Sequence, residues 1–313
     1  MSDVVVVGSG VVGLVTALEL QQRGCHVEVW SRDEPADTVS AVAGAIWYPF
    51  LAEPRERVLG WSAVTYRRLA ELALEPGSGV RMQSVVEVFA TATPDLWWAA
   101  AVPAFERVPR EQLPRGYAAA IRLDVPMCDT PVHLPWLRAR FLAHGGRWLR
   151  RALTSLDEPF ARAPKVVNCT GLGAAELCGD RELQPVRGQV LLVERPTERI
   201  DALIDGSQPR PFYVIPRGSD VVLGGSAQSG DRRLDVDATD SAAILAGIGE
   251  RCPALRGASV RQVKVGLRPY RSSVRVEAEL HARGRLVHNY GHGGAGYTLA
   301  WGCAAEVASL LAD

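Results

Sequence analysis

The stretch that decides the fold is VVVVGSGVVG, from Val4 to Gly13. Its β-branched run predicts a strand buried on both faces. Gly8, Gly10 and Gly13 follow with the spacing G-x-G-x-x-G. In this motif the first glycine allows a tight turn, the second lets backbone approach a pyrophosphate, and the third lets helix and strand pack closely. The stretch therefore predicts a phosphate-binding loop between a strand and a helix.

The residues after this loop complete a βαβ unit. Apolar residues at helical spacing continue until Gly24, and HVEVW, residues 26–30, reads as the next strand. Asp33 lies near the place of a ribose-binding acid, but Ser31 and Arg32 separate it from the strand. Backbone N–H groups at the helix start would face the phosphates. The unit predicts a dinucleotide site, leaves NAD or FAD open, and has a ligand-free turn as its alternative.

The composition of the chain indicates which classes of binding partner to expect. The chain has 313 residues, with 35 basic and 35 acidic side chains, so charge gives no reason to expect nucleic acid or an anionic membrane surface. The early apolar run is too short for a signal peptide or a membrane span. Six cysteines are scattered without metal-binding spacing, which indicates reduced thiols. We expect a cytoplasmic protein without a metal site.

The middle of the chain does not continue the strand–helix alternation of an NAD dehydrogenase. Helical stretches are expected at about 55–74 and 134–143, and most segments from 186 to 287 read as strands. We therefore predict a mixed α/β fold with a Rossmann-like FAD-binding domain built from discontinuous segments, plus an inserted, largely antiparallel sheet domain for the substrate. The predicted boundaries are 1–50, 135–185 and 281–313 for the first domain, and 51–134 and 186–280 for the second.

A second glycine loop, YGHGGAGYTLAWG from Tyr290 to Gly302, lies near the end of the chain. With VVVVGSGVVGL, VAGAIWYPF, VVNCTGLGA, RGQVLLV, PFYVIPRGSDVVLGG and GLRPYR, it resembles the D-amino-acid oxidases, flavoproteins that include D-aspartate oxidases. The resemblance spans nearly the whole chain. It implies non-covalent FAD, with the ADP half on the first loop and the isoalloxazine near the last.

The same resemblance implies a reaction. A hydride would pass from the substrate Cα to flavin N5 without an obligatory side-chain base, and oxygen would reoxidise the flavin, giving 2-oxo acid, ammonia and hydrogen peroxide. Arg268 would hold the substrate carboxylate, Tyr213 would be its second ligand, and Gly294 would also meet the substrate. The implied cofactor contacts are Gly8, Ser9, Gly10, Val11, Val12, Gly13, Ser31, Arg32, Asp33, Ala43, Gly44, Ala45, Leu153, Thr170, Gly171, Arg268, His292, Gly293, Gly294, Ala295, Gly296, Tyr297 and Thr298.

One segment departs from that family. Vertebrate members carry a lid tyrosine at the position of Pro209, and the segment DALIDGSQPRP, residues 201–211, reads as a short loop. A more open site is therefore expected. Trp47 and Tyr48 either line the pocket or belong to the core.

The overlapping segment RIDALIDG, residues 199–206, bears on the substrate side chain. Its centre is Leu203 and Ile204, flanked by Asp201 and Asp205, which favours neutral, apolar D-amino acids over acidic ones. Two arginines could oppose this by reaching the pocket, Arg210 and Arg217.

Several alternatives stay open at this point. They are an oxidase acting on D-aspartate, glycine or sarcosine, an NAD-dependent dehydrogenase, and a non-catalytic nucleotide-binding sensor. The expected partners are a D-amino acid and O2, and a second copy of the chain is a further candidate.

Overall fold

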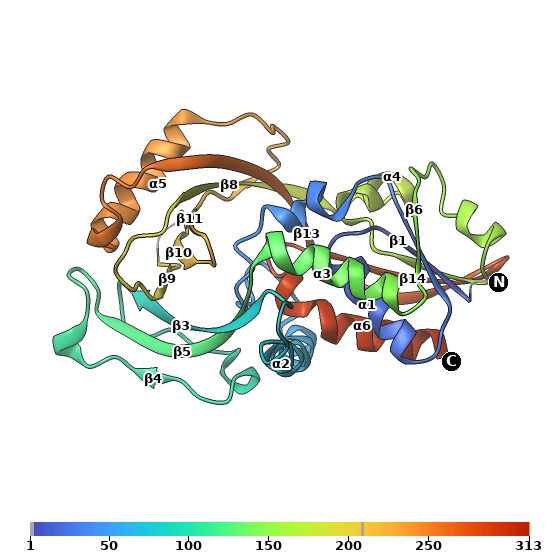
Figure 1. The fold of residues 1–313 in the computed structure, drawn as a ribbon, viewed down its shortest axis with the longest axis horizontal. Helices are drawn as coiled ribbons and strands as arrows, with labels where there is room; N and C mark the ends of the chain where they lie inside the picture. Colours follow the sequence, from blue (N-terminus) through green and yellow to red (C-terminus); the bar gives the residue numbers. More distant parts are fainter. Residues whose placement is uncertain (1–2, 208–209, 313) are drawn as a thin grey trace.

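The computed structural model describes residues 3–207 and 210–312, and its strands form one continuous sheet (Figure 1). Five neighbouring strands are parallel, in the order β14-β7-β1-β2-β6. They are β1 (Val4–Val7), β2 (Val27–Ser31), β6 (Arg147–Arg150), β7 (Lys165–Asn168) and β14 (Gly284–His292). These strands form the parallel sheet that the first glycine loop predicts.

The parallel strands are covered on both faces. Val4 and Val6 pack into a core with α1 (Val11–Gln22), α2 (Arg55–Leu72), α3 (Thr130–Ala143) and α6 (Gly296–Ala312). Val5 and Val7 point the other way and pack against Leu156 and Phe160. Because successive strand residues face opposite sides, this alternation confirms the prediction that the valine run is buried on both faces.

The other part of the sheet is mostly antiparallel and continues in the order β4-β5-β3-β9-β10-β11-β8-β13. Helix α5 (Ala238–Arg251) packs on one face through Ile244 and Ile248. The strands are β3 (Val80–Phe89), β4 (Glu106–Arg107), β5 (Ala119–Cys128), β8 (Gln184–Glu194), β9 (Ala202–Asp205), β10 (Phe212–Pro216), β11 (Asp220–Gly224) and β13 (Val260–His281), with β12 (Gln228–Ser229) paired to β8.

Short helices connect these elements. They are α4 (Ala174–Leu177) and the single 3₁₀ turns Pro35–Asp37, Val39–Ala41, Ala99–Ala101, Arg110–Gln112, Glu158–Ala161, Gly171–Gly173 and Pro253–Leu255. No helix in the described part of the chain is long and apolar enough to cross a bilayer.

Strand β13 joins the two parts of the sheet. Its first half pairs with β8 and its second half with β14, with a register irregularity between Tyr270 and Arg275. In Figure 1 the parallel strands lie on the right, β3, β5 and β9–β11 lie on the left, and β8 and β13 run between them. The predicted mixed α/β fold class is confirmed.

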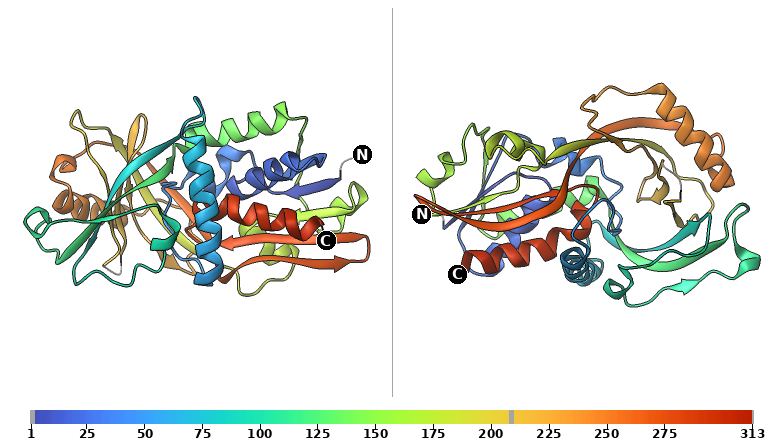
Figure 2. Two further views of the ribbon diagram at one scale, coloured as in Figure 1. Left: turned by 90° about the horizontal axis from the view of Figure 1, so that it is seen from below. Right: turned by 180° about the vertical axis from the view of Figure 1, so that it is seen from behind.

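Two local features differ from what the sequence suggested, and the place of one helix bears on the predicted domains. The segment starting at Asp201 is not simply a loop, because Ala202–Asp205 form β9 between β3 and β10. Strands β3 and β5 were not anticipated. Helix α2, which falls in the range 51–134 assigned to the substrate domain, packs against α6 and stands between the two parts in the left view of Figure 2. The domain boundaries remain a prediction.

Candidate functional site

A cavity of about 1170 Å³ runs between the two glycine loops. It extends from the end of β1, past the start of α6, to the antiparallel strands that carry Tyr213 and Arg268. Drug-sized ligands occupy pockets of about 300–1,000 Å³, so this cavity is large enough for a dinucleotide and a small substrate together.

The first glycine loop has the close contacts that its motif predicts. Gly8 has φ +115°, and a Cβ there would lie 2.4 Å from the carbonyl oxygen of Cys169. A Cβ on Gly13 would lie 2.0 Å from the carbonyl oxygen of Gly8, so Gly13 permits helix–strand packing and does not itself line the cavity. The loop therefore brings unshielded backbone to the cavity wall.

Helix α1 points its amino terminus at this wall. Gly10 is its N-cap and offers no capping side chain, and the first turn contains no acidic residue. Ser40 Oγ accepts a hydrogen bond from the Val11 N–H. The positive end of the helix dipole thus faces the cavity free of any carboxylate in its own first turn, as an anionic pyrophosphate requires.

The residues after β2 lie where the ribose would bind, but the carboxylate expected to bind it already has a partner. Ser31, Arg32 and Asp33 all line the cavity. The Asp33 carboxylate forms an ion pair with Arg32 (2.8 Å), and its backbone oxygen accepts from Ser9 and Ser31. Ser9 and Ser31 thus fix the turn, while the Asp33 carboxylate is already engaged.

The last glycine loop leads from β14 into α6. A Cβ on Gly293, which has φ +54°, would lie 2.2 Å from the Leu51 carbonyl oxygen, and one on Gly294 would lie 2.6 Å from Phe50. The Gly293 N–H donates to Pro269 O and the Ala295 N–H donates to His292 O. The Gly293 N–H is therefore used within the chain, while Gly293 itself lines the cavity as predicted.

His292 and Asn289 place buried polar atoms at the cavity. Both side chains line it, and His292 Nε2 and Asn289 Oδ1 have no hydrogen-bond partner among the described residues. Burial lowers the pKa of His292 to about 4, so the imidazole is neutral at physiological pH. Buried polar atoms are normally satisfied, so these two atoms indicate that a polar ligand completes the site.

Arg268 and Tyr213 are each seated over a glycine. A Cβ on Gly188 would lie 2.2 Å from Arg268 Nη1, and Arg268 also donates to Ser226 O (2.9 Å). A Cβ on Gly224 would lie 1.9 Å from Tyr213 Cζ. The absence of side chains at these glycines lets a guanidinium and a phenol lie against strands β8 and β11 within the cavity.

The structure brings most of the predicted site residues together in this cavity. Those that line it are Gly8, Ser9, Gly10, Val11, Val12, Ser31, Arg32, Asp33, Ala43, Gly44, Ala45, Leu153, Thr170, Gly171, Tyr213, Arg268, His292, Gly293, Gly294, Gly296 and Tyr297. Gly13, Ala295 and Thr298 do not line it. Thr298 Oγ1 instead donates to Tyr48 O and accepts from Tyr48 N–H, so this side chain holds the loop before α2.

Several lining residues were not anticipated. Among them are Thr38, Ser40, Arg151, Gly188 and Asn289. A glycine inside a strand pattern signals close approach of another group, so Gly188 could have been found from RGQVLLV. The others depend on pairings between distant segments. Tyr48 lines the cavity, whereas Trp47 is buried in the core, edge-on to Tyr66.

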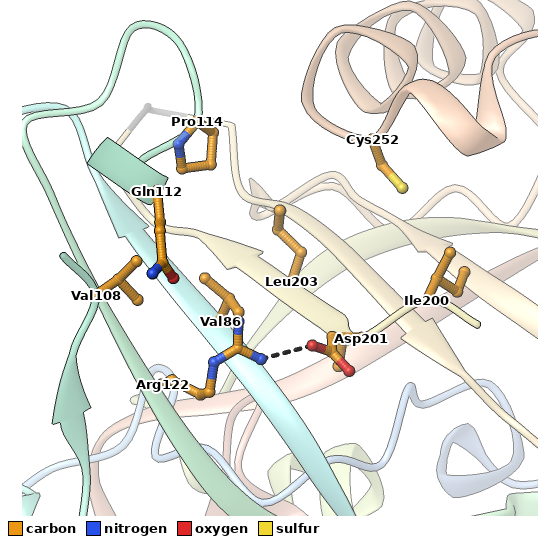
Figure 3. A pocket seen from close by; sticks show the side chains of 10 residues that line it. Val86, Val108, Gln112, Pro114, Arg122, Ile200, Asp201, Leu203 and Cys252 are labelled. Carbon is orange, nitrogen blue, oxygen red and sulfur yellow. Dashed lines mark hydrogen bonds and ion pairs between the residues drawn. The ribbon is translucent and has the colours of Figure 1, made fainter. Parts of the chain in front are cut away.

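The charged groups near β9 are paired away from the cavity. Asp201 pairs with Arg122 (2.6 Å) at a second, smaller cavity (Figure 3). Asp205 is buried and pairs with Arg251 (2.8 Å). Figure 3 shows the Arg122–Asp201 pair beside Leu203.

The two arginines that could have reached the substrate are also engaged. Arg210 pairs with Asp240 (2.8 Å), and Arg217 pairs with Asp220 (2.7 Å) and donates to Thr130. The lid position, Pro209, lies outside the described residues.

The residues present fit FAD. The first glycine loop with the α1 amino terminus suits the pyrophosphate, and the first turn of α6, which contains no acidic residue, suits the electron-rich edge of the isoalloxazine. The unpartnered atoms of His292 and Asn289 lie at the same cavity.

Comparison with known proteins agrees with this geometry. The family model described as FAD dependent oxidoreductase matches residues 3–310. The chain is 43% identical over 310 residues to a D-amino-acid oxidase from Rubrobacter xylanophilus, covering 98% of this chain and 94% of that protein. It is 37% identical over 326 residues to human D-aspartate oxidase, covering 99% and 94%.

Solved structures share the fold. A glycine oxidase from Bacillus cereus superposes with a TM-score of 0.80 at 19% identity, covering 100% of this chain and 95% of that one. With the family match over nearly all of its length, the chain belongs to the DAO family of FAD-dependent oxidoreductases, and its cofactor is FAD.

Proposed function

We propose that the protein is a D-amino-acid oxidase that deaminates neutral D-amino acids and passes the electrons to O2. The observation that carries the proposal is the position of Arg268 and Tyr213, which line the same cavity as both glycine loops. The D-amino-acid oxidase from Rubrobacter xylanophilus, similar over nearly the full length, supports the same reaction.

Each residue of the site has a defined task in this reaction. Arg268 stays charged and can bond both oxygens of the substrate carboxylate, and Tyr213 donates its phenol hydrogen to one of them. These contacts orient the Cα–H bond, because a fixed carboxylate removes most of the rotational freedom of the substrate. Bound FAD supplies the hydride acceptor, and O2 is the final oxidant that leaves as hydrogen peroxide.

The proposal assigns no side-chain base to this chain. His292 is buried, and its pKa is lowered to about 4, so it is a weak acceptor for a substrate proton. Its Nε2 atom is better suited to a hydrogen bond with a bound donor. The released imino acid then hydrolyses in water to the 2-oxo acid and ammonia.

Preference for neutral over acidic side chains follows from the pairing near β9. Ile204 lines the cavity, while the two candidate cations, Arg210 and Arg217, are paired with Asp240 and Asp220. A substrate carboxylate buried there without a cation would cost several kcal/mol. We therefore expect kcat/KM for D-valine, D-methionine or D-phenylalanine to exceed that for D-aspartate by at least about 10²-fold.

Steady-state measurement of peroxide release tests both the oxidase reaction and the preference for neutral side chains. The panel includes these D-amino acids, their L-enantiomers, D-aspartate, glycine and sarcosine. Within this panel, turnover of D-valine, D-methionine and D-phenylalanine alone is the expected result. D-aspartate, glycine or sarcosine as the best substrate would replace the proposal with one of the alternatives, and absence of peroxide with every compound would refute an oxidase.

Location and assembly are further proposals. All six cysteines are free thiols, which supports a reducing compartment such as the cytoplasm. A homodimer remains our expectation for a partner, and light scattering of the purified protein tests it.

A further inference from the structure

One row of directly paired residues crosses three strands on the side of the cavity opposite Arg268. Tyr213 on β10 is paired with Ile204 on β9, and Ile204 is paired with Glu87 on β3. Directly paired residues on neighbouring strands point to the same face of a sheet. Glu87 therefore follows Tyr213 and Ile204 on one face, two strand spacings from Tyr213, or about 10 Å.

That face is the one toward the main cavity. Tyr213 and Ile204 both line it. The preceding residues in β3 and β9, Val86 and Leu203, are also paired with each other and line the smaller cavity of about 240 Å³ on the other face (Figure 3). Because side chains alternate along a strand, Glu87 belongs to the side of the sheet where the substrate would bind.

Glu87 is joined to the cavity wall by Tyr48. The Tyr48 hydroxyl donates to Glu87 Oε1 at 2.5 Å, and Tyr48 lines the cavity. Burial raises the pKa of Tyr48 well above 10, so this proton stays on the phenol and in the hydrogen bond. The Tyr48 oxygen therefore has only lone pairs left for any other partner.

The second oxygen of Glu87 has no partner. Glu87 is 4% exposed, and among the described residues Oε2 has neither a hydrogen bond nor a cation within ion-pair distance. Burial raises the pKa of this carboxyl to about 7, so only above pH 7 is it mostly ionised, with both oxygens acting as acceptors. Leaving a buried carboxyl oxygen unsatisfied costs free energy, and the cost is removed when a donor arrives.

Nearby cations are occupied elsewhere. Arg122 on β5 pairs with Asp201, and Arg251 at the end of α5 pairs with Asp205 on β9. Among the described residues, neither of these arginines is therefore free to compete for Glu87 Oε2.

We propose that Tyr48 at the cavity wall and the ionised Glu87 behind it form an acceptor end of the side-chain pocket, which extends the substrate range from the neutral side chains above to long side chains that end in an N–H donor. An ammonium or guanidinium group is the best match, followed by a primary amide. An apolar stem passes Ile204, and its terminal donor meets the Tyr48 oxygen and Glu87. A side-chain carboxylate, which offers only acceptors, is rejected by the same pair. This inference rests on the proposed function, because it assumes that Arg268 holds the carboxylate.

Substrate pairs of equal length test the proposal with the FAD-loaded enzyme. We expect kcat/KM for D-lysine to exceed that for D-norleucine. In Glu87→Gln the ratio of these two values falls at least 10-fold, and in Tyr48→Phe it falls less, because Glu87 remains. Glu106→Gln, on the exposed strand β4, removes one negative charge from the same sheet and leaves the ratio as it was.

Equilibrium binding separates this inference from the proposed function. Calorimetry compares 6-aminohexanoate with hexanoate, which share a carboxylate and differ in the terminal ammonium. Tighter binding of 6-aminohexanoate in the wild type, lost in Glu87→Gln, supports the pocket even if no D-amino acid is oxidised. Equal binding of the two acids, or equal losses for D-lysine and D-norleucine in a folded Glu87→Gln protein, would overturn it.

Discussion

Substituting Gly188 by alanine tests whether the position of the Arg268 guanidinium controls turnover. The added methyl carbon would lie 2.2 Å from Nη1, 2.4 Å from Cζ and 2.5 Å from Nη2 of Arg268. Carbon atoms in contact are normally about 3.5–4.0 Å from their neighbours, so the guanidinium has to move by more than about 1 Å. The backbone itself tolerates alanine, because no left-handed φ is found at Gly188.

This displacement should lower kcat/KM strongly while changing the free energy of unfolding only slightly. A misplacement of about 1 Å can reduce turnover by about 10²-fold, and we expect a loss of this size in kcat/KM. The moving group is the end of a flexible side chain and can lose its hydrogen bond to Ser226 O, so the free energy of unfolding should change by less than about 1.5 kcal/mol. FAD should remain bound, since the contact lies at the substrate end of the cavity.

The assay is peroxide release with D-methionine, with thermal unfolding and the flavin spectrum of each protein. Gly206→Ala is the matched control, because Gly206 also lines the cavity but, among the described residues, no atom lies within 4 Å of the added carbon. If Gly188→Ala turns over normally while Arg268→Leu does not, the anchor tolerates displacement and the geometric reasoning fails. If neither variant is impaired, Arg268 is not the carboxylate anchor.

Three further predictions follow from the site. Arg268→Leu should lose roughly 2–5 kcal/mol of transition-state binding and Tyr213→Phe about 0.5–3 kcal/mol, with FAD still bound; near-normal kcat/KM for Arg268→Leu would contradict the assignment. Acid precipitation should release the yellow colour into the supernatant, because we expect non-covalent FAD; colour kept in the pellet would refute this. Lastly, stability should fall at acid pH. His133 and His292 each have a pKa of about 4 in the folded protein, against about 6.5 in the unfolded chain. The unfolded chain therefore binds more protons below pH 6.5, and the free energy of unfolding decreases toward pH 4 by up to about 1.4 kcal/mol per pH unit for each histidine. Urea unfolding at pH 7.5, 6 and 5 measures the slope, which should shrink in His133→Gln; an unchanged slope would argue against a buried neutral imidazole.

Much of the fold was predictable because its signals are local. The valine run and the glycine spacing define β1, the turn and α1 within twenty residues, and α2 and α6 follow from apolar periodicity. Strands β3 and β5 were not predicted, although many of their residues favour strands. The clearest pattern in that part of the sequence was the helical periodicity on either side of them. β9 was read as a loop because Gly206 and the prolines after it suggest a turn.

The site was predictable to the extent that motifs carry it. Arg268 and Tyr213 could be assigned by resemblance, and both line the cavity. Thr298 could not be judged in this way, because its hydroxyl binds the backbone of Tyr48, a residue 250 positions earlier. Glu87 could not be predicted as a site residue for the same reason, because only the parallel pairing of β3 with β9 places it beside Ile204. Pairings of this kind depend on the assembled sheet and leave no local trace.

The continuity of β13 has a consequence for how the enzyme can move. Arg268 lies where β13 pairs with β8, and two residues later Tyr270 is paired with His292, at the start of the flavin loop. The substrate anchor and the loop beside the cofactor are therefore fixed to one hydrogen-bonded ladder. Rotating one part of the molecule against the other would break that ladder, so the distance from carboxylate to flavin is set when the chain folds. Entry and exit of substrate then have to depend on the rim of the cavity, and changes made to the rim should alter access without altering the geometry of hydride transfer.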